Sequence, residues 1–329
     1  MLQLPTCVHV FLGIGLLFLG TGCSMTSHAS ESPVPVVLAI HGGAGTLLRE
    51  DMTPDKEAAY RAALEEALRA GHAVISKGGS AMDAVTATIR PMEESALFNA
   101  GKGAVLTHDE RCELDASVMD GGTGLAGAVA GVSTVRSPIL AARAVMEHSE
   151  HVMLSGPGAE SFATEQGLEI VPNTFFQTDR RREQLRQSIA DEKHGTVGCV
   201  ALDAAGHLAA GTSTGGMTNK RWGRIGDSPV VGAGVWAEDE TCAISSTGWG
   251  EFFIRGAVAH DVAARMRYGG ESLWDASRAV ILGTLTDKGG TGGLIALDRE
   301  GNVSAPFNTA GMYRGWIDAA GNVTIHIFR

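Results

Sequence analysis

The order of apolar blocks along the chain constrains its fold more than any other feature. From Pro33 onward, short apolar runs typical of buried strands alternate with longer blocks whose apolar residues recur at helical spacing. Each half of the chain combines strands with helices, and the second half closes with strands again. A sheet or an amphipathic helix must bury its apolar face against another layer. The sequence therefore predicts sheets covered by helices, an α/β or α+β layered fold.

Capping residues mark where these elements begin. Thr53-Pro54 and the run Ser80 to Asp83 are helix-start signals, because their hydroxyls can accept from the free N–H groups of a first turn. We expect helices over 54–75, 80–94, 252–267 and 272–286, with others from Ser137 and near Arg180. We expect strands near 36–40, 104–107, 113–119, 126–135, 197–202, 230–236, 241–246, 293–298 and 303–307.

Charge and glycine content narrow the classes of protein. Residues 180–194 are the most charged stretch, and we expect an exposed linker there, directly before the apolar run 197–202. The 44 glycines are about twice the usual share and lie in clusters, where the missing Cβ lets backbone approach backbone or ligand closely. The net charge is −11 and no block of lysine or arginine occurs, so we expect no nucleic-acid partner.

The N-terminal segment predicts export. Residues 1–29 carry no Asp, Glu, Lys or Arg and include the apolar run 10–20, which is too short to span a bilayer of about 30 Å but fits a signal peptide. Two outcomes stay open: cleavage after Ala29, or lipidation of Cys23 within a lipobox-like segment. We therefore expect a periplasmic or lipoprotein-anchored protein, with a lipid anchor as its one contact with a membrane. Cys199 and Cys242 lie in apolar runs and are predicted to be buried and unpaired.

Two glycine motifs match known sites, but their surroundings do not fit. Gly122 to Gly127 matches G-x-G-x-x-G, yet the residues that follow are typical of a strand rather than the helix a dinucleotide requires. Gly211 to Gly215 matches G-x-S-x-G, yet no helical face follows it. His148 and His151 lie three residues apart without a third metal ligand. We therefore expect no ligand or catalytic site at either glycine motif, and no catalytic metal.

The junction Gly195-Thr196 is different, because an exposed charged linker meets a threonine that opens a buried strand. A threonine hydroxyl is a weak nucleophile and needs a base. If the chain is cut between these two residues, the new α-amino group of Thr196, with a pKa of about 7.7–8.0, can be that base. Glycine before the cut leaves the scissile carbonyl sterically uncovered. Alone the junction is weak evidence, since threonine commonly starts a strand.

Segments downstream supply the groups that such a nucleophile needs. The run 212–220 is rich in hydroxyls and belongs to the strand expected beside Thr196. Arg224 and Asp227 lie three residues apart around a turn, where they can clamp the carboxylate and the ammonium of an α-amino acid, or form an internal salt bridge instead. Thr247 and Gly248 lie between a strand and a helix, where they can donate hydrogen bonds to an oxyanion.

Together these motifs resemble those of the plant-type asparaginase/isoaspartyl peptidase family of N-terminal-nucleophile (Ntn) hydrolases, close to its bacterial isoaspartyl dipeptidase/asparaginase group. The matching motifs, in family order, are His41–Gly45, Phe98–Gly103, Gly195–Gly198, Thr212–Asn219, Arg224–Asp227 and Thr247–Glu251. The resemblance implies an α+β fold, the αββα sandwich of the Ntn type. It also implies a precursor that cuts itself into an α subunit (30–195) and a β subunit (196–329), assembled as an (αβ)2 heterotetramer.

The resemblance further implies the roles of single residues. Thr196 would be the nucleophile of both self-cleavage and catalysis, hydrogen-bonded to Thr214 and approached by Asn99 from the α subunit. Thr247 and Gly248 would form the oxyanion hole. The substrate-binding residues would be Arg224, Ile225, Gly226, Asp227, Thr247, Gly248, Trp249 and Gly250. Within this set Arg224 would hold the substrate α-carboxylate and Asp227 its α-amino group. Trp249 departs from the family pattern, which has a smaller residue there.

The implied reaction is hydrolysis of small molecules, β-aspartyl dipeptides and L-asparagine, through an ester on Thr196. No metal or organic cofactor is implied for catalysis, while the segment Met92–Lys102 resembles a loop whose backbone carbonyls bind a structural sodium ion. Two other functions stay open at this point. One is an aspartylglucosaminidase that removes glycan from asparagine, and the other is an exported, unprocessed binder of amino acids or peptides.

Overall fold

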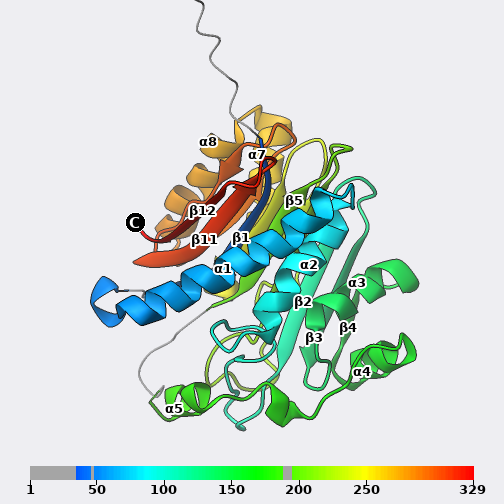
Figure 1. Ribbon diagram of the computed structural model, residues 1–329, viewed down its shortest axis with the longest axis vertical. Helices are drawn as coiled ribbons and strands as arrows, with labels where there is room; N and C mark the ends of the chain where they lie inside the picture. The colour runs from blue at the N-terminus through cyan, green and yellow to red at the C-terminus, as the bar shows by residue number, and fades with distance from the viewer. Residues whose placement is uncertain (1–34, 46–47, 188–194) are drawn as a thin grey trace, which may run out of the picture. The chain divides into compact units, whose positions relative to one another are not determined.

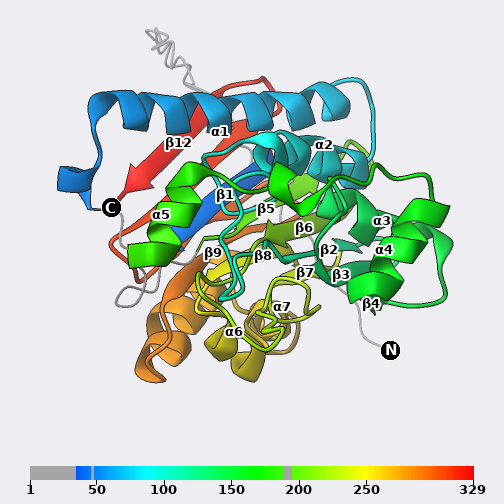
Figure 2. The same ribbon diagram turned by 90° about the horizontal axis from the view of Figure 1, so that it is seen from below.

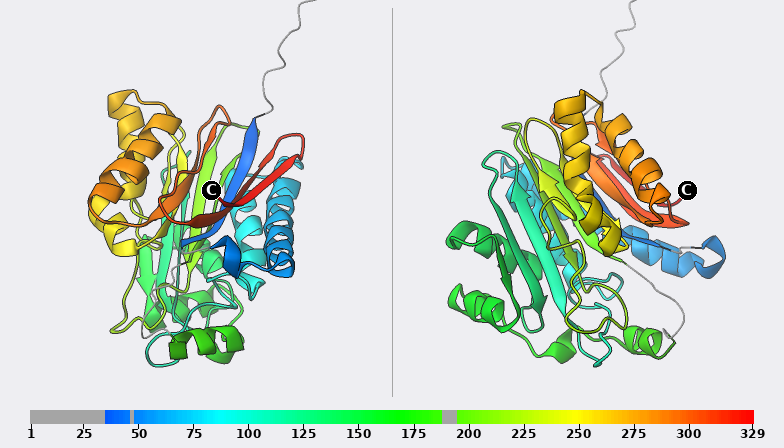
Figure 3. Two further views of the ribbon diagram at one scale, coloured as in Figure 1. Left: turned by 90° about the vertical axis from the view of Figure 1, so that its left-hand side faces the viewer. Right: turned by 180° about the vertical axis from the view of Figure 1, so that it is seen from behind.

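Two sheets stack face to face, and helices cover the outer side of each (Figures 1 and 2). The computed structural model describes residues 35–45, 48–187 and 195–329. Within them the larger sheet has eight strands in the order β12-β11-β1-β5-β6-β2-β3-β4, and the smaller has four in the order β10-β9-β8-β7. Figure 3 shows the resulting helix–sheet–sheet–helix layers from the side. The expected αββα sandwich is confirmed.

The larger sheet consists of β1 (Val36–Gly45), β2 (Leu114–Asp120), β3 (Ala126–Val132), β4 (Met153–Ser155), β5 (Val197–Leu202), β6 (Leu208–Thr214), β11 (Gly311–Asp318) and β12 (Val323–Phe328). The smaller sheet consists of β7 (Val235–Ala237), β8 (Ala243–Gly248), β9 (Gly292–Leu297) and β10 (Val303–Ser304). The α-helices are α1 (Pro54–Ile75), α2 (Ala81–Glu94), α3 (Pro138–His148), α4 (Gly156–Glu165), α5 (Asp179–Gln187), α6 (Gly250–Gly256), α7 (Val258–Gly269) and α8 (Leu273–Arg278). A π-helical turn (Ala279–Leu285) and short 3-10 helices (Arg49–Asp51, Asn173–Phe175) complete the set.

Three apolar clusters hold the layers together. In the first, apolar faces of α1, α2 and α3 pack on the larger sheet, with Leu64 and Ile89 fully buried. In the second, α7 and α8 pack on the smaller sheet. The third lies between the two sheets, where Val200 of β5 and Ile295 of β9 belong to the same cluster. Since burial of apolar area is the main favourable term in folding, the two sheets and both helix layers stabilise one another.

The capping predictions for the two long N-terminal helices are confirmed. The hydroxyl of Thr53 accepts from the N–H of Lys56 at the start of α1, and that of Ser80 accepts from the N–H of Asp83 at the start of α2. The strand predicted over 197–202 is also confirmed with the same bounds, as β5. It lies in the middle of the larger sheet, antiparallel to β1 and β6.

One strand expectation is wrong. Residues 104–107 form a buried loop rather than a strand, because the N–H of Val105 donates to the Asn99 side chain and that of Thr107 to the Arg111 carbonyl, instead of to a strand. The helix predicted near Arg180 is confirmed as α5, at the start of the charged stretch 180–194, and it is held by hydrogen bonds of Arg180 and Arg181 to backbone carbonyls. Residues 188–194 lie outside the described part.

Other elements differ in length. The helix expected over 252–267 is divided at Ala257, whose φ of 45° and ψ of 47° separate α6 from α7. The strands expected near 126–135, 230–236 and 303–307 are shorter, because bends, a turn, irregular backbone and isolated bridges occupy the remaining residues. The export segment 1–29, with Cys23, lies outside the described residues. Among those described, no helix is long and apolar enough to cross a membrane.

Candidate active site

Thr196 directly precedes the central strand of the larger sheet. Its side chain is buried, and the backbone of Gly43 in β1 packs against the bond before it. A Cβ on Gly43 would lie 3.0 Å from Gly195 Cα and 3.3 Å from Thr196 N, which is tighter than normal packing. Gly43 has φ +110°, a backbone conformation that residues with a side chain rarely adopt. The Gly195–Thr196 peptide bond therefore lies against a stretch of β1 where only glycine fits.

The carbonyl oxygen of Gly195 accepts two hydrogen bonds. The Asn99 Nδ2 atom donates at 2.7 Å and the Thr214 hydroxyl donates at 3.0 Å. Asn99 is itself fixed, since its Oδ1 accepts from Val105 N and its Nδ2 also donates to Gly216 O. Two donors directed at one carbonyl oxygen polarise the carbonyl and stabilise negative charge that develops there.

The hydroxyls of Thr196 and Thr214 form a directed chain. Thr196 Oγ1 lies 3.2 Å from Thr214 Oγ1, to which it donates. A hydroxyl has one proton, and that of Thr214 is directed at the Gly195 carbonyl, so Thr214 accepts from Thr196 and from Gly216 N. The chain thus runs from the nucleophile hydroxyl, through Thr214, to the oxygen of the bond that precedes the nucleophile. This arrangement suits proton transfer during attack on Gly195.

A buried histidine fixes the other side of Thr196. Burial lowers the pKa of His41 to about 3, so its ring is neutral. Because a carbonyl can only accept, His41 Nδ1 donates to Thr196 O at 3.0 Å, and Nε2 accepts from the Ser245 hydroxyl at 2.8 Å. Ser245 lies on β8, so this bond joins the two sheets behind Thr196. A Cβ on Gly198 would overlap both side chains, which explains a glycine there.

Arg224 is oriented by Glu251, the second residue of α6. Its Nε and Nη2 atoms donate to the two carboxylate oxygens of Glu251 at 2.9 and 2.8 Å. Such a bidentate pair fixes the guanidinium plane as well as its position. Cβ atoms on Gly226 and Gly250 would lie 2.8 Å from Nη1 and 3.0 Å from Nη2, so glycines border this guanidinium. The ion pair with Glu251 uses Nε and Nη2, so Nη1 is the part of Arg224 that can bind another anion.

Asp227 lies beside the same glycines, and the pKa of its carboxyl group is shifted. Burial raises the pKa of its carboxyl group to about 7, although Arg224 opposes the shift. Its Oδ2 is buried and has no hydrogen-bond partner within the described residues. A Cβ on Gly250 would lie 2.8 Å from Asp227 Oδ1. An ammonium group in this space would pair with the Asp227 carboxylate. This pairing would offset the free-energy cost of burying the carboxylate charge.

Thr247 and Gly248 end β8, and α6 starts at Gly250. The Thr247 hydroxyl is buried and accepts from Ala44 N at 3.3 Å, which links it to the residue after Gly43. Gly248 has φ +151° and packs against Gly292 of β9. The predicted strand-to-helix junction is thus confirmed, and Ala44 links it to the end of β1 that borders the Gly195–Thr196 bond. Trp249 packs edge-to-face on Phe252, whereas Ile225 is 41% exposed at the surface.

The segment from Met92 to Lys102 starts in the last turn of α2 and then folds back on it. The N–H of Lys102 donates to the Glu93 carbonyl, and Gly103 packs against the carbonyls of Ala96 and Phe98, which would lie 2.8 and 2.9 Å from a Cβ there. Backbone carbonyls that converge in this way are the ligands that a hard cation such as sodium prefers. Several of them already accept hydrogen bonds, those of Ala96 and Leu97 from Arg180.

Sequence reasoning missed three functional residues of this region. His41 and Glu251 belong to motifs that it identified, but nothing in their spacing shows that they contact Thr196 and Arg224. Ser245 lies in an apolar strand pattern and gives no signal of its bond to His41. Each of these contacts joins segments more than 25 residues apart, so only the folded chain brings them together.

The rejected motifs are structural. Gly122 to Gly127 leads into β3 rather than a helix, and Gly211 to Gly215 belongs to β6 and the loop after it. His148 is the last residue of α3. In the described ranges no group of three or more His, Cys, Asp or Glu side chains could hold a metal ion. Cys199 and Cys242 are buried and unpaired, as predicted.

The chain is similar to known proteins over most of its length. A family described as Asparaginase matches residues 34–327. The isoaspartyl peptidase of Escherichia coli (strain K12) is 52% identical over 308 residues, which cover 89% of this chain and 96% of the relative. A plant-type L-asparaginase of Pyrobaculum calidifontis is 42% identical over 291 residues, covering 85% and 96% of the two chains. A putative isoaspartyl peptidase/L-asparaginase of Dictyostelium discoideum is 44% identical, covering 85% and 93%.

Proposed function

The chain belongs to the asparaginase family, and from this premise we propose that it is a self-processing hydrolase of β-aspartyl dipeptides and L-asparagine. Self-cleavage between Gly195 and Thr196 would create its nucleophile. One observation carries the proposal: two hydrogen-bond donors are directed at the Gly195 carbonyl oxygen, and the Thr196 hydroxyl donates into the same chain through Thr214. A glycine carbonyl at the start of an ordinary strand needs no such arrangement.

Self-cleavage follows from this geometry in balanced steps. Thr196 Oγ bonds to the Gly195 carbonyl carbon, its proton passes to Thr214 Oγ, and the Thr214 proton passes to the carbonyl oxygen. Asn99 stabilises the negative charge that develops on that oxygen during attack, before the proton arrives. The C=O bond then re-forms and the C–N bond breaks as the proton on this oxygen passes to the Thr196 nitrogen, which leaves Gly195 as an ester on Thr196. Water hydrolyses the ester, and the products are a Gly195 carboxylate and a free Thr196 α-amine.

Substrate hydrolysis would use the same nucleophile with its new base. The Thr196 α-amine takes the proton of Oγ, which attacks the side-chain carbonyl of the substrate. Thr247 and Gly248 would stabilise the oxyanion. Arg224, held by Glu251, would bind the substrate α-carboxylate, and Asp227 would bind its α-amino group. Ammonia or an amino acid leaves with the proton of the amine, and water releases aspartate from the ester.

Denaturing electrophoresis with mass spectrometry tests the proposal. We expect two fragments that meet at Gly195 and Thr196, and a single chain in Thr196→Ala. Rates on β-aspartyl-leucine, L-asparagine and glycosylated asparagine then separate this function from that of an aspartylglucosaminidase. A wild-type protein that stays a single chain and releases neither ammonia nor aspartate would instead be a binder of amino acids, and the proposal would be wrong.

Three further features belong to this proposal. Export rests on the apolar, uncharged segment 1–29, and cell fractionation with the mass of the mature N-terminus tests it. Assembly as (αβ)2 rests on the family resemblance, and light scattering should give twice the mass of one processed chain. A structural sodium ion in the loop from Met92 to Lys102 is supported by its convergent carbonyls, and a higher melting temperature in sodium than in choline chloride would support it.

A further inference from the structure

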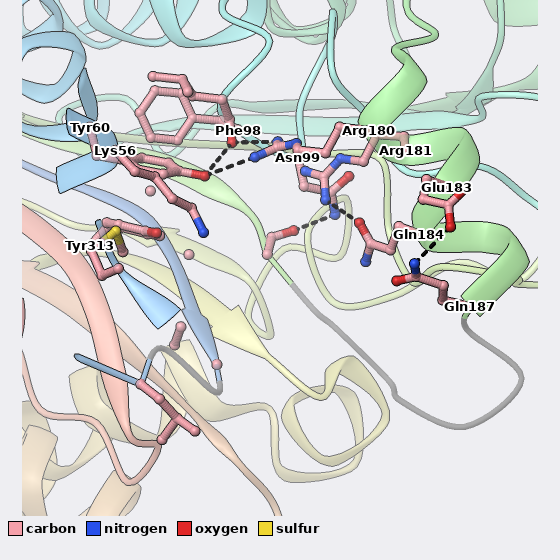
Figure 4. Close-up of a pocket in the computed structure, with 18 residues that line it drawn as sticks. Lys56, Tyr60, Phe98, Asn99, Arg180, Arg181, Glu183, Gln184, Gln187 and Tyr313 are labelled. Carbon is pink, nitrogen blue, oxygen red and sulfur yellow. Dashed lines mark hydrogen bonds between the residues drawn. The ribbon is translucent and has the colours of Figure 1, made fainter. Parts of the chain in front are cut away.

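A cavity of about 390 Å³ lies beside Gly195, on the side of β1, α1 and α5 (Figure 4). Its volume is within the range of small-ligand sites, about 300–1,000 Å³. Figure 4 shows side chains from α1 and β11 on one side and from α5 on the other. The lining residues that the argument uses are Met52, Lys56, Tyr60, Asn99, Arg180 and Tyr313. None of the groups assigned to the aspartyl part of a substrate, Arg224 and Asp227, lines this cavity.

The cavity is lined by apolar surface and by positively charged side chains. Tyr60 and Tyr313 stack with their ring centroids 4.2 Å apart, and Met52 adds apolar surface beside them. Lys56 and Arg180 contribute cationic side chains from opposite sides. In a chain of net charge −11, a cavity with more lysine and arginine than acid favours a ligand that carries a carboxylate. An apolar amino acid with a free carboxylate fits both properties.

The wall formed by α5 does not depend on the Gly195–Thr196 bond. Arg180 donates to the Tyr60 hydroxyl at 3.0 Å and to the carbonyl of Leu97 at 2.8 Å. Arg181, which is half-buried, donates to Gly103 O at 2.6 Å. These bonds connect α5 to segments that precede it in the chain. Cutting after Gly195 leaves all of them intact, so the cavity remains bounded in the processed protein.

The chemistry of the nucleophile directs the leaving group toward this cavity. The Thr196 nitrogen takes a proton from Oγ and must return it to the leaving nitrogen, so that nitrogen has to lie within hydrogen-bond reach, about 3 Å, of Thr196 N. Gly43 and Gly195 border Thr196 N, and both line the cavity. A leaving group within reach of Thr196 N would therefore lie beside residues that line the cavity.

We propose that this cavity is the binding site for the leaving residue of a β-aspartyl dipeptide, with apolar residues favoured and their free carboxylate held by Lys56 and Arg180. The inference rests on the proposed function and adds to it where the leaving residue binds and which leaving residues are preferred. The aspartyl half binds at Arg224 and Asp227, and the leaving amino acid occupies the cavity. L-Asparagine releases only ammonia, which does not extend into the cavity. The two substrates therefore depend on different parts of the site.

Steady-state kinetics of Lys56→Glu test the assignment. Lys56 lies in the first turn of α1, where a glutamate is favourable to the helix, so the variant is expected to fold. Reversal of the charge should raise KM for β-aspartyl-leucine about fivefold, while KM for L-asparagine changes less than twofold. With the C-terminal amide of β-aspartyl-leucine the increase should disappear, because the carboxylate is gone. Lys77→Glu, just beyond the other end of α1, is the charge-matched control and should change none of these values.

The outcomes separate the two proposals. If wild type hydrolyses both substrates but Lys56→Glu changes KM for both by the same factor, or for neither, the cavity does not bind the leaving residue. An increase that persists with the amide contradicts the role given to the carboxylate. A wild-type protein that hydrolyses neither substrate contradicts the proposed function itself, and the assignment of the cavity with it.

Discussion

Asn99 Nδ2 lies 2.7 Å from the carbonyl oxygen of Gly195, a residue 96 positions later in the chain. Asn99 comes from the loop after α2, which the α subunit would contribute, and Gly195 precedes the strand that the β subunit would begin with. The same amide also donates to Gly216 O, so it is held between two carbonyls rather than free to turn away. This contact would make the proposed self-cleavage depend on a single amide.

Asn99→Asp should slow self-cleavage about 100-fold. The substitution replaces a donor by a carboxylate oxygen next to the Gly195 carbonyl, so charge developing there is repelled instead of stabilised. The measurement is the fraction of uncut chain over time on denaturing gels. Asn173→Asp is the matched control, because Asn173 likewise accepts from one backbone N–H and donates to two carbonyls, away from the junction. Equal processing in Asn99→Asp and wild type would contradict the role of this amide.

Glu251→Gln should raise KM for L-asparagine about tenfold and leave kcat within twofold. Glutamine cannot form the bidentate ionic pair that orients Arg224, so the guanidinium loses its fixed plane for the substrate carboxylate. Glu65→Gln removes a similar pair with Arg69 on α1 and should leave both constants unchanged. A lower KM in Glu251→Gln would mean that Glu251 competes with the substrate for Arg224, and this interpretation would be wrong.

Gly198→Ala should cost about 1–3 kcal/mol of stability and slow self-cleavage. A Cβ there would overlap Ser245 Oγ and His41 Nε2, so the histidine that donates to Thr196 O must shift. Urea denaturation and gel-based processing rates measure the two effects. Gly158→Ala is the control, since α4 has open space at that position and alanine favours a helix. Processing at the wild-type rate would show that the position of His41 does not matter.

The layers and the nucleophile strand could be predicted from sequence, because apolar periodicity and caps are local signals. Val197–Leu202 is apolar at every position, as a strand buried on both faces requires, and the structure has it with those bounds. The segment 104–107 has a similar apolar pattern but no strand, because the Asn99 side chain accepts from Val105 N. Periodicity reports burial and does not show which partner a backbone N–H will find.

The same limit applies to the site. The Gly195–Thr196 junction is visible in the sequence, because a charged stretch borders an apolar one there and the chemistry of threonine requires a terminus. The partner of Arg224 is not visible, since Glu251 reaches it only where the start of α6 meets the loop before Asp227. Short-range motifs thus identify the reacting groups, whereas the residues that orient them depend on packing between elements.

Glu93→Gln should change how the stability of the protein depends on pH. The Glu93 carboxylate is 1% exposed, and its oxygens accept from the hydroxyls of Ser137 and Ser213 and from Ile139 N. Burial raises the pKa of this group to about 7, from an ordinary value near 4.5, and the hydrogen bonds offset only part of the shift. The folded protein therefore binds more protons than the unfolded chain between these two values, so this group makes stability fall as pH rises from about 4.5 through 7.

Wild type should lose roughly 2 kcal/mol more than Glu93→Gln in its free energy of unfolding between pH 5 and pH 8, because glutamine does not ionise. Urea denaturation in a Thr196→Ala background keeps the chain in one piece for the measurement. Glu160→Gln is the control for lost hydrogen bonds. The Glu160 carboxylate accepts from the N–H and from the hydroxyl of Ser133, and it lies at a less buried position. If Glu93→Gln and wild type show parallel pH profiles, Glu93 is ionised throughout this range and its burial does not shift its pKa.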